Sequence, residues 1–503
     1  MNQNSSPQQQ ISIGQALGIA GLAGTIFIAT KAAERFHMGI QDAIIAITIS
    51  VGVIGAASMG AMMIFKRKPK KAKSSGAEIV LAKAIHQEWW KADQALPIGM
   101  QDFRHILVTG TTGSGKSTFI RRFIEQILSK KKNFLYIDFK GERDDLDQIG
   151  KICKEQGGSD PLQVFDISNS EKCITFNPLT VFESVEETVG FISSVFFDEN
   201  SNEYYQSEAE RFLRHSINLL DAASETRTFE SIQKIYYEST ARSSLLKASK
   251  KSAGLIVADY ETFFTKEFEA LSPRDRSERY SGLMSILAAF NSNELKRIFS
   301  PEGESELKLA NIFEAKRNLI IRVPGEVFGD LSARIVKAFI KIIPVLLVKR
   351  REERNRNEYC LLFDEGCSYM DETMIEILKK AGSANVKMLI TRMCDADFQA
   401  KDPSFLGRML SSFNLFVCFQ TMDPDTRDTL ARISMTIQDT KATSRWSQGA
   451  DTGEASVRDV QRFRIHPSDF GTLKTGECFM IAPTLNLYQK VRVLPPESTR
   501  VTA

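Results

Sequence analysis

The sequence has few cysteines and little net charge. Its 503 residues include 7 cysteines, none of them in a C-x-x-C pair, and the formal net charge is only +3. Because metal sites and disulfide frameworks need closely spaced cysteines, this spacing argues against both and favours reduced, buried thiols in a cytoplasmic domain. The small net charge does not indicate a nucleic-acid-binding protein, so any basic surface has to be local.

The composition is otherwise that of a globular protein. Hydrophobic residues make up 43% and charged residues 25% of the chain, which are ordinary fractions for a soluble domain. The length suggests about two to four domains, and each is long enough to bury a core.

Two uncharged stretches near the N-terminus predict a membrane anchor. Residues 11–30 and 43–65 carry no charge, and helices over about 11–30 and 42–65 reach about 30 Å or more, enough for a hydrocarbon core. The basic run KRKPKKAK (66–73) follows them. By the positive-inside rule the large domain and the N-terminus are cytoplasmic, with a short loop outside. We therefore predict a two-pass membrane anchor at residues 1–75.

Two other interpretations of this region are weaker or additional. A cleaved signal peptide needs a basic n-region, and residues 1–30 contain no Lys or Arg. The basic run is mainly a topology signal, but it also predicts contact with anionic membrane lipids.

A phosphate-binding loop follows a short apolar run. The spacing Gly110-x-x-x-x-Gly115-Lys116-Ser117 is that of a P-loop. A strand at 105–109 precedes it, and a helix with one apolar face follows it. The predicted nucleotide-binding residues are Gly110, Thr111, Thr112, Gly113, Ser114, Gly115, Lys116, Ser117 and Thr118. Backbone N–H groups hold phosphates in such loops, the lysine reaches the β- and γ-phosphates, and the serine hydroxyl ligates Mg²⁺.

A second acidic element is needed for hydrolysis. An apolar strand at 359–363 ends in Asp364 and Glu365. We predict that Asp364, with Ser117, holds Mg²⁺, and that Glu365 and Lys116 are the catalytic residues, Glu365 as the general base for the attacking water. Taken alone, this pattern also fits an acidic turn after a buried strand. Its pairing with the P-loop favours ATP hydrolysis.

Further short apolar runs alternate with helical patterns. We predict strands at 133–139, 318–323, 386–391 and 414–421, which gives a parallel sheet with helices on both faces. Glu365 next to Asp364, and a strand between the P-loop strand and the Asp364 strand in sequence, indicate a RecA-like P-loop ATPase. The fold class is therefore α/β.

A helical stretch interrupts the ATPase pattern. Residues 183–310 contain almost no strand-like runs, so we predict an all-α domain inserted between ATPase segments 76–182 and 311–503. The alternative is a set of long crossover helices.

For several charged or polar segments, the sequence is compatible with more than one role. Arg392 follows a predicted strand on the nucleotide side, and it or Arg408 is a candidate γ-phosphate sensor or arginine finger; a surface arginine is an equally good interpretation. KRREERNRN (349–357) is predicted to be a solvated loop, with DNA contact as the alternative. Residues 445–463 are predicted to be a surface loop.

The order of these elements resembles a known family: the membrane-bound coupling ATPases of conjugative type IV secretion systems, the TraD and TrwB family. The resemblance covers most of the chain. The matching segments are LPIGMQDFRHILVTGTTGSGKSTFIRRF (96–123), YIDFKGE (136–142), FNPL (176–179), LLFDEG (361–366) and HPSDFGTLKTGECFMIAP (466–483), the last a short helix leading into a final strand with a Pro turn.

The resemblance implies a function and partners. It implies a homohexameric ring at the inner membrane that hydrolyses ATP to drive relaxase-bound single-stranded DNA into a type IV secretion channel. The alternatives are a coupling ATPase that exports protein effectors and a membrane assembly protein that only binds nucleotide. An ABC-type ATPase is disfavoured because its Leu-Ser-Gly-Gly-Gln signature is missing before Asp364.

The sequence departs from the family in two informative places. The segment between the two predicted membrane helices is short, which puts contacts with channel components there in doubt. Relatives usually carry Gln after the strand that follows the hydrolytic one, whereas this sequence has Thr391 and Arg392. This difference leaves the γ-phosphate sensor unassigned.

Overall fold

The computed structural model describes most of the chain after the predicted anchor. The described residues are 78–85, 93–156, 162–197, 201–250, 257–309, 312–313, 317–353, 356–365, 371–399, 403–447 and 450–497. They belong to one compact unit, Gly76–Ala503. The predicted membrane helices at 11–30 and 42–65 lie outside this part of the chain. Among the described residues, no helix combines the length and the apolar character needed to cross a bilayer.

An eleven-stranded sheet organises the described chain, in the order β2-β1-β13-β12-β9-β3-β8-β7-β4-β6-β5. Its strands are β1 (Glu78–Ala84), β2 (Gln94–Gly99), β3 (His105–Thr109), β4 (Asn133–Asp138), β5 (Leu162–Asp166), β6 (Asn318–Arg322), β7 (Tyr359–Asp364), β8 (Val386–Arg392), β9 (Leu415–Cys418), β12 (Glu477–Ala482) and β13 (Leu487–Val493). From β9 to β5 every neighbouring pair is parallel. The predicted parallel sheet is thus confirmed for this half.

The antiparallel pairing in the other half of the sheet was not predicted. β12, β13, β1 and β2 extend it as antiparallel neighbours beyond β9. The C-terminal part of this extension has the predicted form, because the short helix α18 (Pro467–Gly471) leads into β12 and a turn at Pro483 follows.

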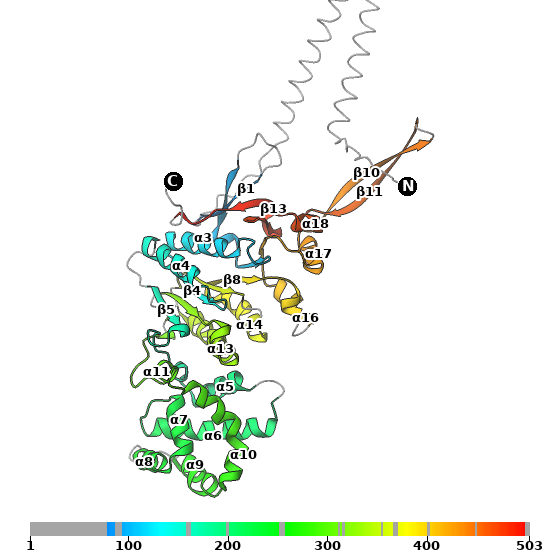
Figure 1. Ribbon diagram of the computed structural model, residues 1–503. Helices are drawn as coiled ribbons and strands as arrows, with labels where there is room; N and C mark the ends of the chain where they lie inside the picture. The colour runs from blue at the N-terminus through cyan, green and yellow to red at the C-terminus, as the bar shows by residue number, and fades with distance from the viewer. Residues whose placement is uncertain are drawn as a thin grey trace, which may run out of the picture. The chain divides into compact units, whose positions relative to one another are not determined.

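Helices cover both faces of the sheet, as predicted (Figure 1). On one face α3 (Lys116–Ser129) and α4 (Arg143–Gln156) pack on strand residues such as Ile106 and Val108. On the other face the strand residue Leu107 belongs to the core formed with α13 (Asp330–Glu352), α14 (Glu372–Ala381), α16 (Pro403–Leu410) and α17 (Pro424–Ile433). Successive side chains of a strand point to opposite faces of the sheet, so alternate residues pack into the two cores.

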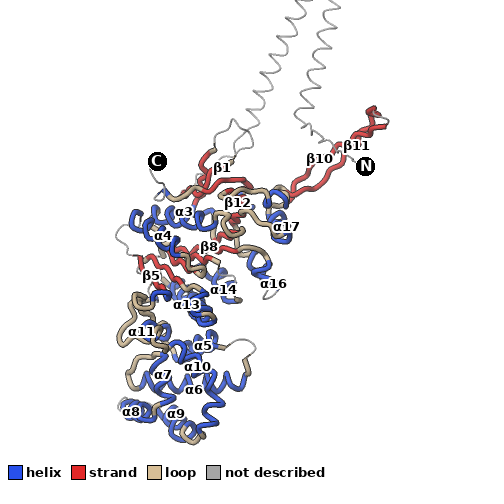
Figure 2. Tube along the Cα trace, viewed as in Figure 1, coloured by secondary structure: helices blue, strands red, loops and turns tan. Residues whose placement is uncertain are grey.

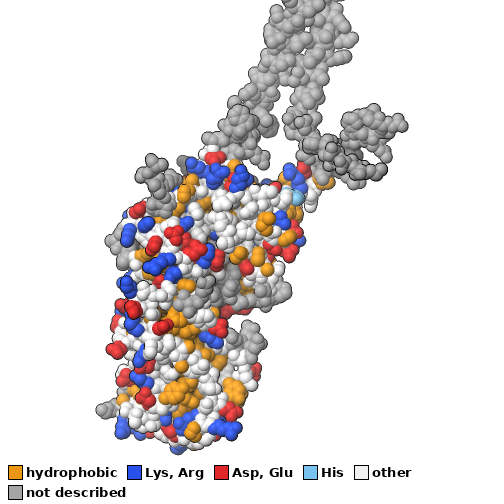
Figure 3. Space-filling view, in the orientation of Figure 1, with side chains coloured by type: hydrophobic (Ala, Val, Ile, Leu, Met, Phe, Trp, Pro, Cys, Tyr) orange, Lys and Arg blue, Asp and Glu red, His pale blue; other side chains and the backbone are white. Residues whose placement is uncertain are grey.

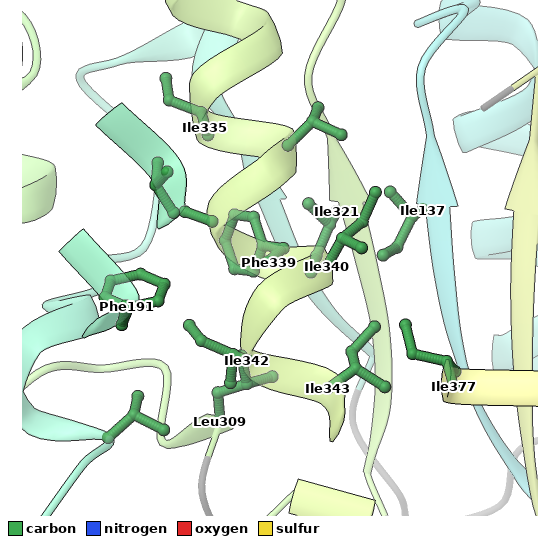
Figure 4. Packing of buried hydrophobic residues seen from close by; sticks show 14 of the residues in the cluster. Ile137, Phe191, Leu309, Ile321, Ile335, Phe339, Ile340, Ile342, Ile343 and Ile377 are labelled. Carbon is green, nitrogen blue, oxygen red and sulfur yellow. The ribbon is translucent and has the colours of Figure 1, made fainter. Parts of the chain in front are cut away.

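The long helix α13 joins the sheet to the helical region between β5 and β6. In Figure 4, Phe339, Ile340 and Ile343 of α13 lie beside Ile321 of β6 and Ile137 of β4. The Phe339 ring also stacks on Phe176, with centroids 4.9 Å apart. Burial of such large apolar side chains is the main stabilising contribution to this junction.

The segment between β5 and β6 is helical, as the sequence indicated. Figure 2 shows helices and loops there, and no strand occurs among the described residues between Val185 and Phe299. The helices are α5 (Val185–Phe196), α6 (Glu203–Ala222), α7 (Phe229–Tyr237), α8 (Ser239–Ser249), α9 (Val257–Thr262) with a π-helical turn (Phe263–Phe268), α10 (Pro273–Phe290) and α11 (Lys296–Phe299). Its boundaries at 183 and 310 as an independent domain stay a prediction.

The expected surface loop at 445–463 is instead part of a β-hairpin. Strands β10 (Thr436–Ser447) and β11 (Ala450–Phe463) pair antiparallel and form a sheet of their own. In Figure 1 this ribbon extends away from α17 and α18. A polar, Gly- and Ser-containing segment can form such a ribbon because backbone pairing, rather than burial of an apolar face, defines it.

The basic run at 349–357 is also not a simple solvated loop. Its first residues end α13, and Arg350 is buried with Nε donating to the Ala384 carbonyl oxygen at 2.9 Å. Arg356 donates to the Ser383 carbonyl oxygen at 2.8 Å. These two arginines join the end of α13 to the turn before β8.

Candidate nucleotide site

The P-loop connects β3 to α3 in a conformation that requires glycine. Gly113 and Gly115 have φ of +75° and +120°, in the region that L side chains rarely adopt. A Cβ on Gly110 would lie 2.6 Å from Cβ of Phe419, which is shorter than any tolerated contact. The three glycines of the loop are therefore required by backbone geometry or by packing.

The loop folds around the ammonium group of Lys116. Lys116 is 6% exposed, and its Nζ donates to the carbonyl oxygens of Gly110 at 2.7 Å and Thr111 at 3.2 Å. Burial lowers the pKa of Lys116, and the negative charges of Glu365 and Asp364 oppose that shift. Those charges act on Lys116 because the turn after β7 faces the P-loop. Ser117 and Thr118, in the first turn of α3, are partly exposed.

Two distant segments hold the P-loop in place, and neither was predicted to do so. After β9, the Gln420 carbonyl oxygen accepts a hydrogen bond from Thr111 N at 2.9 Å. Before β12, Gly476 N donates to the Ser114 carbonyl oxygen at 2.9 Å. A Cβ on Gly115 would lie 3.2 Å from the Gly476 Cα, so the C-terminal segment packs directly against the loop.

Asp364 ends β7 and is almost completely buried, with 2% exposure. Its Oδ1 accepts a hydrogen bond from the Thr391 hydroxyl at 2.5 Å, and its Oδ2 accepts one from the Tyr136 hydroxyl at 3.2 Å. Burial raises the pKa of Asp364, Glu365 raises it further, and the bonds from Thr391 and Tyr136 oppose the rise. A nearby cation favours the ionised form of a carboxylate, so a metal ion bound at Asp364 would oppose the effect of burial.

Glu365 follows in an unusual conformation. Its φ is +50°, which is uncommon for a residue with a side chain and is often found at functional sites. Its backbone N–H donates to the Thr391 hydroxyl oxygen at 2.8 Å. Thr391 therefore fixes both acidic residues from the neighbouring strand β8, which lies between β3 and β7.

The residues present fit a magnesium–nucleotide complex. Ser117 and Asp364 offer the hard oxygen donors that Mg²⁺ prefers, and two protein ligands are enough because phosphates and waters complete its octahedron. The predicted residues from 110 to 118 form one continuous loop and helix start, at the same edge of the parallel sheet as Asp364.

We expect Thr391→Val to impair hydrolysis and stability together. The change leaves Asp364 Oδ1 and the Glu365 N–H without their buried partner, which costs about 1–3 kcal/mol of unfolding free energy, and we expect the ATPase rate to fall about tenfold or more. Loss of a donor to Asp364 raises its pKa, so the acid limb of the pH–rate profile should move to higher pH.

The control for this prediction is Thr391→Ser, which keeps the hydroxyl. It should retain the wild-type pH profile and most of the rate in the same ATPase assay. Equal profiles for Thr391→Val and the wild-type protein would contradict the assigned role of the hydroxyl.

The two candidate arginines occupy different surroundings. The Arg392 side chain is fully buried, pairs with Asp395 at 2.7 Å and donates from Nε to the Thr109 hydroxyl at 3.0 Å. A guanidinium held inside the fold cannot extend into a neighbouring subunit, so the prediction of Arg392 as an arginine finger is corrected. Arg408 is 41% exposed and forms two 2.6 Å hydrogen bonds to Glu372, which leaves it as the remaining candidate.

Comparison with known proteins supports the fold. Residues 91–298 match the family model described as the central domain of the helicase HerA. No curated relative matches the chain by sequence.

Solved structures resemble it over most of its length. The unbound bacterial conjugative coupling protein TrwB lacking its N-terminal 70 residues has a TM-score of 0.57 at 15% identity, over 80% of this chain and 87% of TrwB. TrwB with ADP and Mg²⁺ has a TM-score of 0.55 at 15% identity, over 85% and 96%. VirB4 of Thermoanaerobacter pseudethanolicus has a TM-score of 0.52 at 12% identity, over 84% and 98%.

At these identities the likeness establishes the fold. It agrees with the resemblance predicted from the order of the sequence motifs. The fold of the chain is that of the conjugative coupling protein TrwB, with a P-loop between β3 and α3.

Proposed function

We propose that the chain hydrolyses ATP with Mg²⁺ at the P-loop and the end of β7. The observation that carries this proposal is the strand order: β3 and β7 run parallel on either side of β8, so the P-loop and the pair Asp364 and Glu365 lie at the same edge of the sheet. The structure of TrwB with ADP and Mg²⁺ supports the choice of ligands.

Each residue has a defined task in this proposal. Residues 110–118 bind the phosphates through backbone N–H groups and the Lys116 ammonium, which exchanges its two carbonyl partners for phosphate oxygens. Ser117 and Asp364 hold Mg²⁺, which neutralises charge on the phosphates when it is bound. Glu365 accepts the proton of the attacking water.

We further propose that this hydrolysis drives relaxase-bound single-stranded DNA toward a type IV secretion channel during conjugation. The fold shared with the conjugative coupling protein TrwB supports this function. The proposal includes the anchor in residues 1–75, a two-pass arrangement in a bacterial inner membrane with contact to its lipids, and a homohexameric ring. Arg408 is the candidate arginine finger of such a ring.

Export of protein effectors is the second candidate function. The net charge is only +3, and Lys and Arg side chains are intermixed with Asp and Glu over the face shown in Figure 3. A mixed surface suits protein cargo at least as well as a phosphate backbone.

DNA binding at several salt concentrations separates the two functions. If the chain moves DNA, the full-length protein in detergent should bind a fluorescent single-stranded oligonucleotide, and log K should fall linearly with log salt, by roughly 0.7 per contacted phosphate. Binding that is absent at low salt would favour protein cargo.

A further inference from the structure

The turn after β4 lies beside the predicted hydrolytic residues. β4 is the parallel neighbour of β7, and Asp138 pairs in register with Asp364. Residues that follow the two strands therefore emerge at the same edge of the sheet, Glu365 from β7 and Lys140 from β4. Strand neighbours lie about 5 Å apart, so the two side chains leave the sheet close together.

This turn is held rigidly by neighbours from three strands. Gly141 has φ of +71°, and a Cβ there would lie 2.5 Å from Cγ of Pro324. The Gly141 N–H donates to Asp138 Oδ1 at 2.8 Å. Arg322 of β6 donates to the Gly141 carbonyl oxygen and pairs with Asp166 of β5 at 2.9 Å. The position of Lys140 is thus fixed by the sheet.

The Lys140 side chain remains available from this rigid turn. It is 27% exposed and forms an ion pair with Glu142 at 2.7 Å, while the Glu142 side chain is itself 50% exposed. Glu142 together with Glu365 and Asp364 raises the pKa of Lys140 against the effect of burial, and Lys140 in turn lowers the pKa of Lys116. The two ammonium groups therefore share one electrostatic environment that also includes both acids.

The neighbouring strand β8 does not offer an accessible donor at its end. The hydroxyl of Thr391 is occupied by Asp364 and by the Glu365 N–H, and the side chain of Arg392 is fully buried. Neither Thr391 nor Arg392 can therefore contact the γ-phosphate in place of the glutamine that relatives carry after this strand. Lys140, on the opposite side of β7, carries a partly exposed positive charge at the same sheet edge, where it pairs with Glu142.

We propose that Lys140 binds the γ-phosphate of ATP in its own chain's site, as a second lysine beside Lys116, and so distinguishes ATP from ADP. The inference rests on the proposed ATP site. Glu142 holds Lys140 in the absence of nucleotide, and the ammonium group exchanges that carboxylate for a γ-phosphate oxygen when ATP binds. Rigid positioning by β4, β5 and β6 reduces the entropic cost of this contact.

The test compares two nucleotides on the full-length Lys140→Gln protein in detergent. Loss of one charge-assisted hydrogen bond should weaken binding of a non-hydrolysable ATP analogue about 10- to 100-fold, and the affinity for ADP should stay within about twofold of wild type. Lys140→Arg should recover part of the loss. Glu142→Gln, the matched control, removes only the resting partner and should bind the analogue at least as well as wild type.

Two outcomes would overturn the inference. If Lys140→Gln binds the ATP analogue with unchanged affinity, Lys140 does not contact the γ-phosphate. If its affinities for the analogue and for ADP fall equally, the substitution has disturbed the structure of the turn. Lys116→Ala in the same assay separates these results from failure of the site itself. If Lys116→Ala also leaves both affinities unchanged, the nucleotide site is wrong. If only Lys116→Ala weakens binding, Lys140 alone is wrongly assigned.

Discussion

Replacing Glu365 with Gln should lower the rate of ATP hydrolysis by a factor of about 10² to 10⁴ while ATP binding persists. The amide has the size of the carboxylate but cannot accept the proton of the attacking water. The backbone N–H of Glu365 bonds to Thr391, and this bond does not depend on the side chain. The unusual φ of +50° is therefore expected to persist in the variant, so the loss should be in kcat, with KM for ATP nearly unchanged.

The measurement is steady-state phosphate release together with ATP affinity. Glu304→Gln is a matched control, because Glu304 is 84% exposed and forms an ion pair with Lys308 in the loop between α11 and β6. It should hydrolyse ATP at the wild-type rate. A Glu365→Gln protein with more than about a tenth of the wild-type kcat would mean that another group activates the water.

Lys116→Ala should abolish hydrolysis by removing nucleotide affinity. The Lys116 ammonium is the buried donor of the P-loop, 6% exposed and held by two carbonyl oxygens. Loss of a charged hydrogen bond to phosphate costs about 1.5–3 kcal/mol, which corresponds to an affinity for ATP about 10- to 150-fold lower. The rate at fixed ATP should fall further, because the same charge stabilises the transition state.

Although Lys116→Ala should lose activity, the free energy of unfolding of the apo protein is not expected to fall. Without nucleotide, the Lys116 charge is buried and burial lowers its pKa, so removing it should not destabilise the apo protein. Thermal unfolding with and without ATP measures both effects. Lys130→Ala, an exposed lysine directly after the same helix, should keep the ATP-dependent increase in Tm. An equal increase in Lys116→Ala would contradict phosphate binding by this loop.

The centre of the fold was predictable because burial determines it. β3, β4, β6, β7, β8 and β9 are short apolar runs between amphipathic helices, and each matches a predicted strand within a few residues. Fully buried parallel strands leave this signal in a sequence. The P-loop was predictable for a related reason, since its glycines are required by backbone conformation.

The edges of the sheet gave weaker signals. No strand was predicted at β1 (Glu78–Ala84), and its place beside β13 depends on a pairing across more than 400 residues. The hairpin formed by β10 and β11 lacks an apolar alternation that predicts strands. The position of β1 depends on long-range backbone pairing, which no local pattern records, whereas β10 and β11 pair within one hairpin.

The hydrogen-bond partners of Asp364 could not be predicted from the sequence either. Thr391 and Tyr136 reach its carboxylate only because β8 and β4 flank β7 in the sheet. The sequence drew attention to Thr391 as a departure from glutamine, but its role became visible only with the strand order. The same order buries Arg392 and brings Lys140 to the site.

The rate of ATP hydrolysis with and without single-stranded DNA tests the central claim most directly. Full-length wild-type protein and Glu365→Gln, both in detergent with lipid, should be assayed side by side over a range of salt. We expect DNA to stimulate hydrolysis by the wild-type protein, the stimulation to fade as salt rises, and the variant to stay inactive throughout. A rate that is indifferent to DNA would contradict a DNA-moving ATPase, and equal rates in both proteins would contradict the site itself.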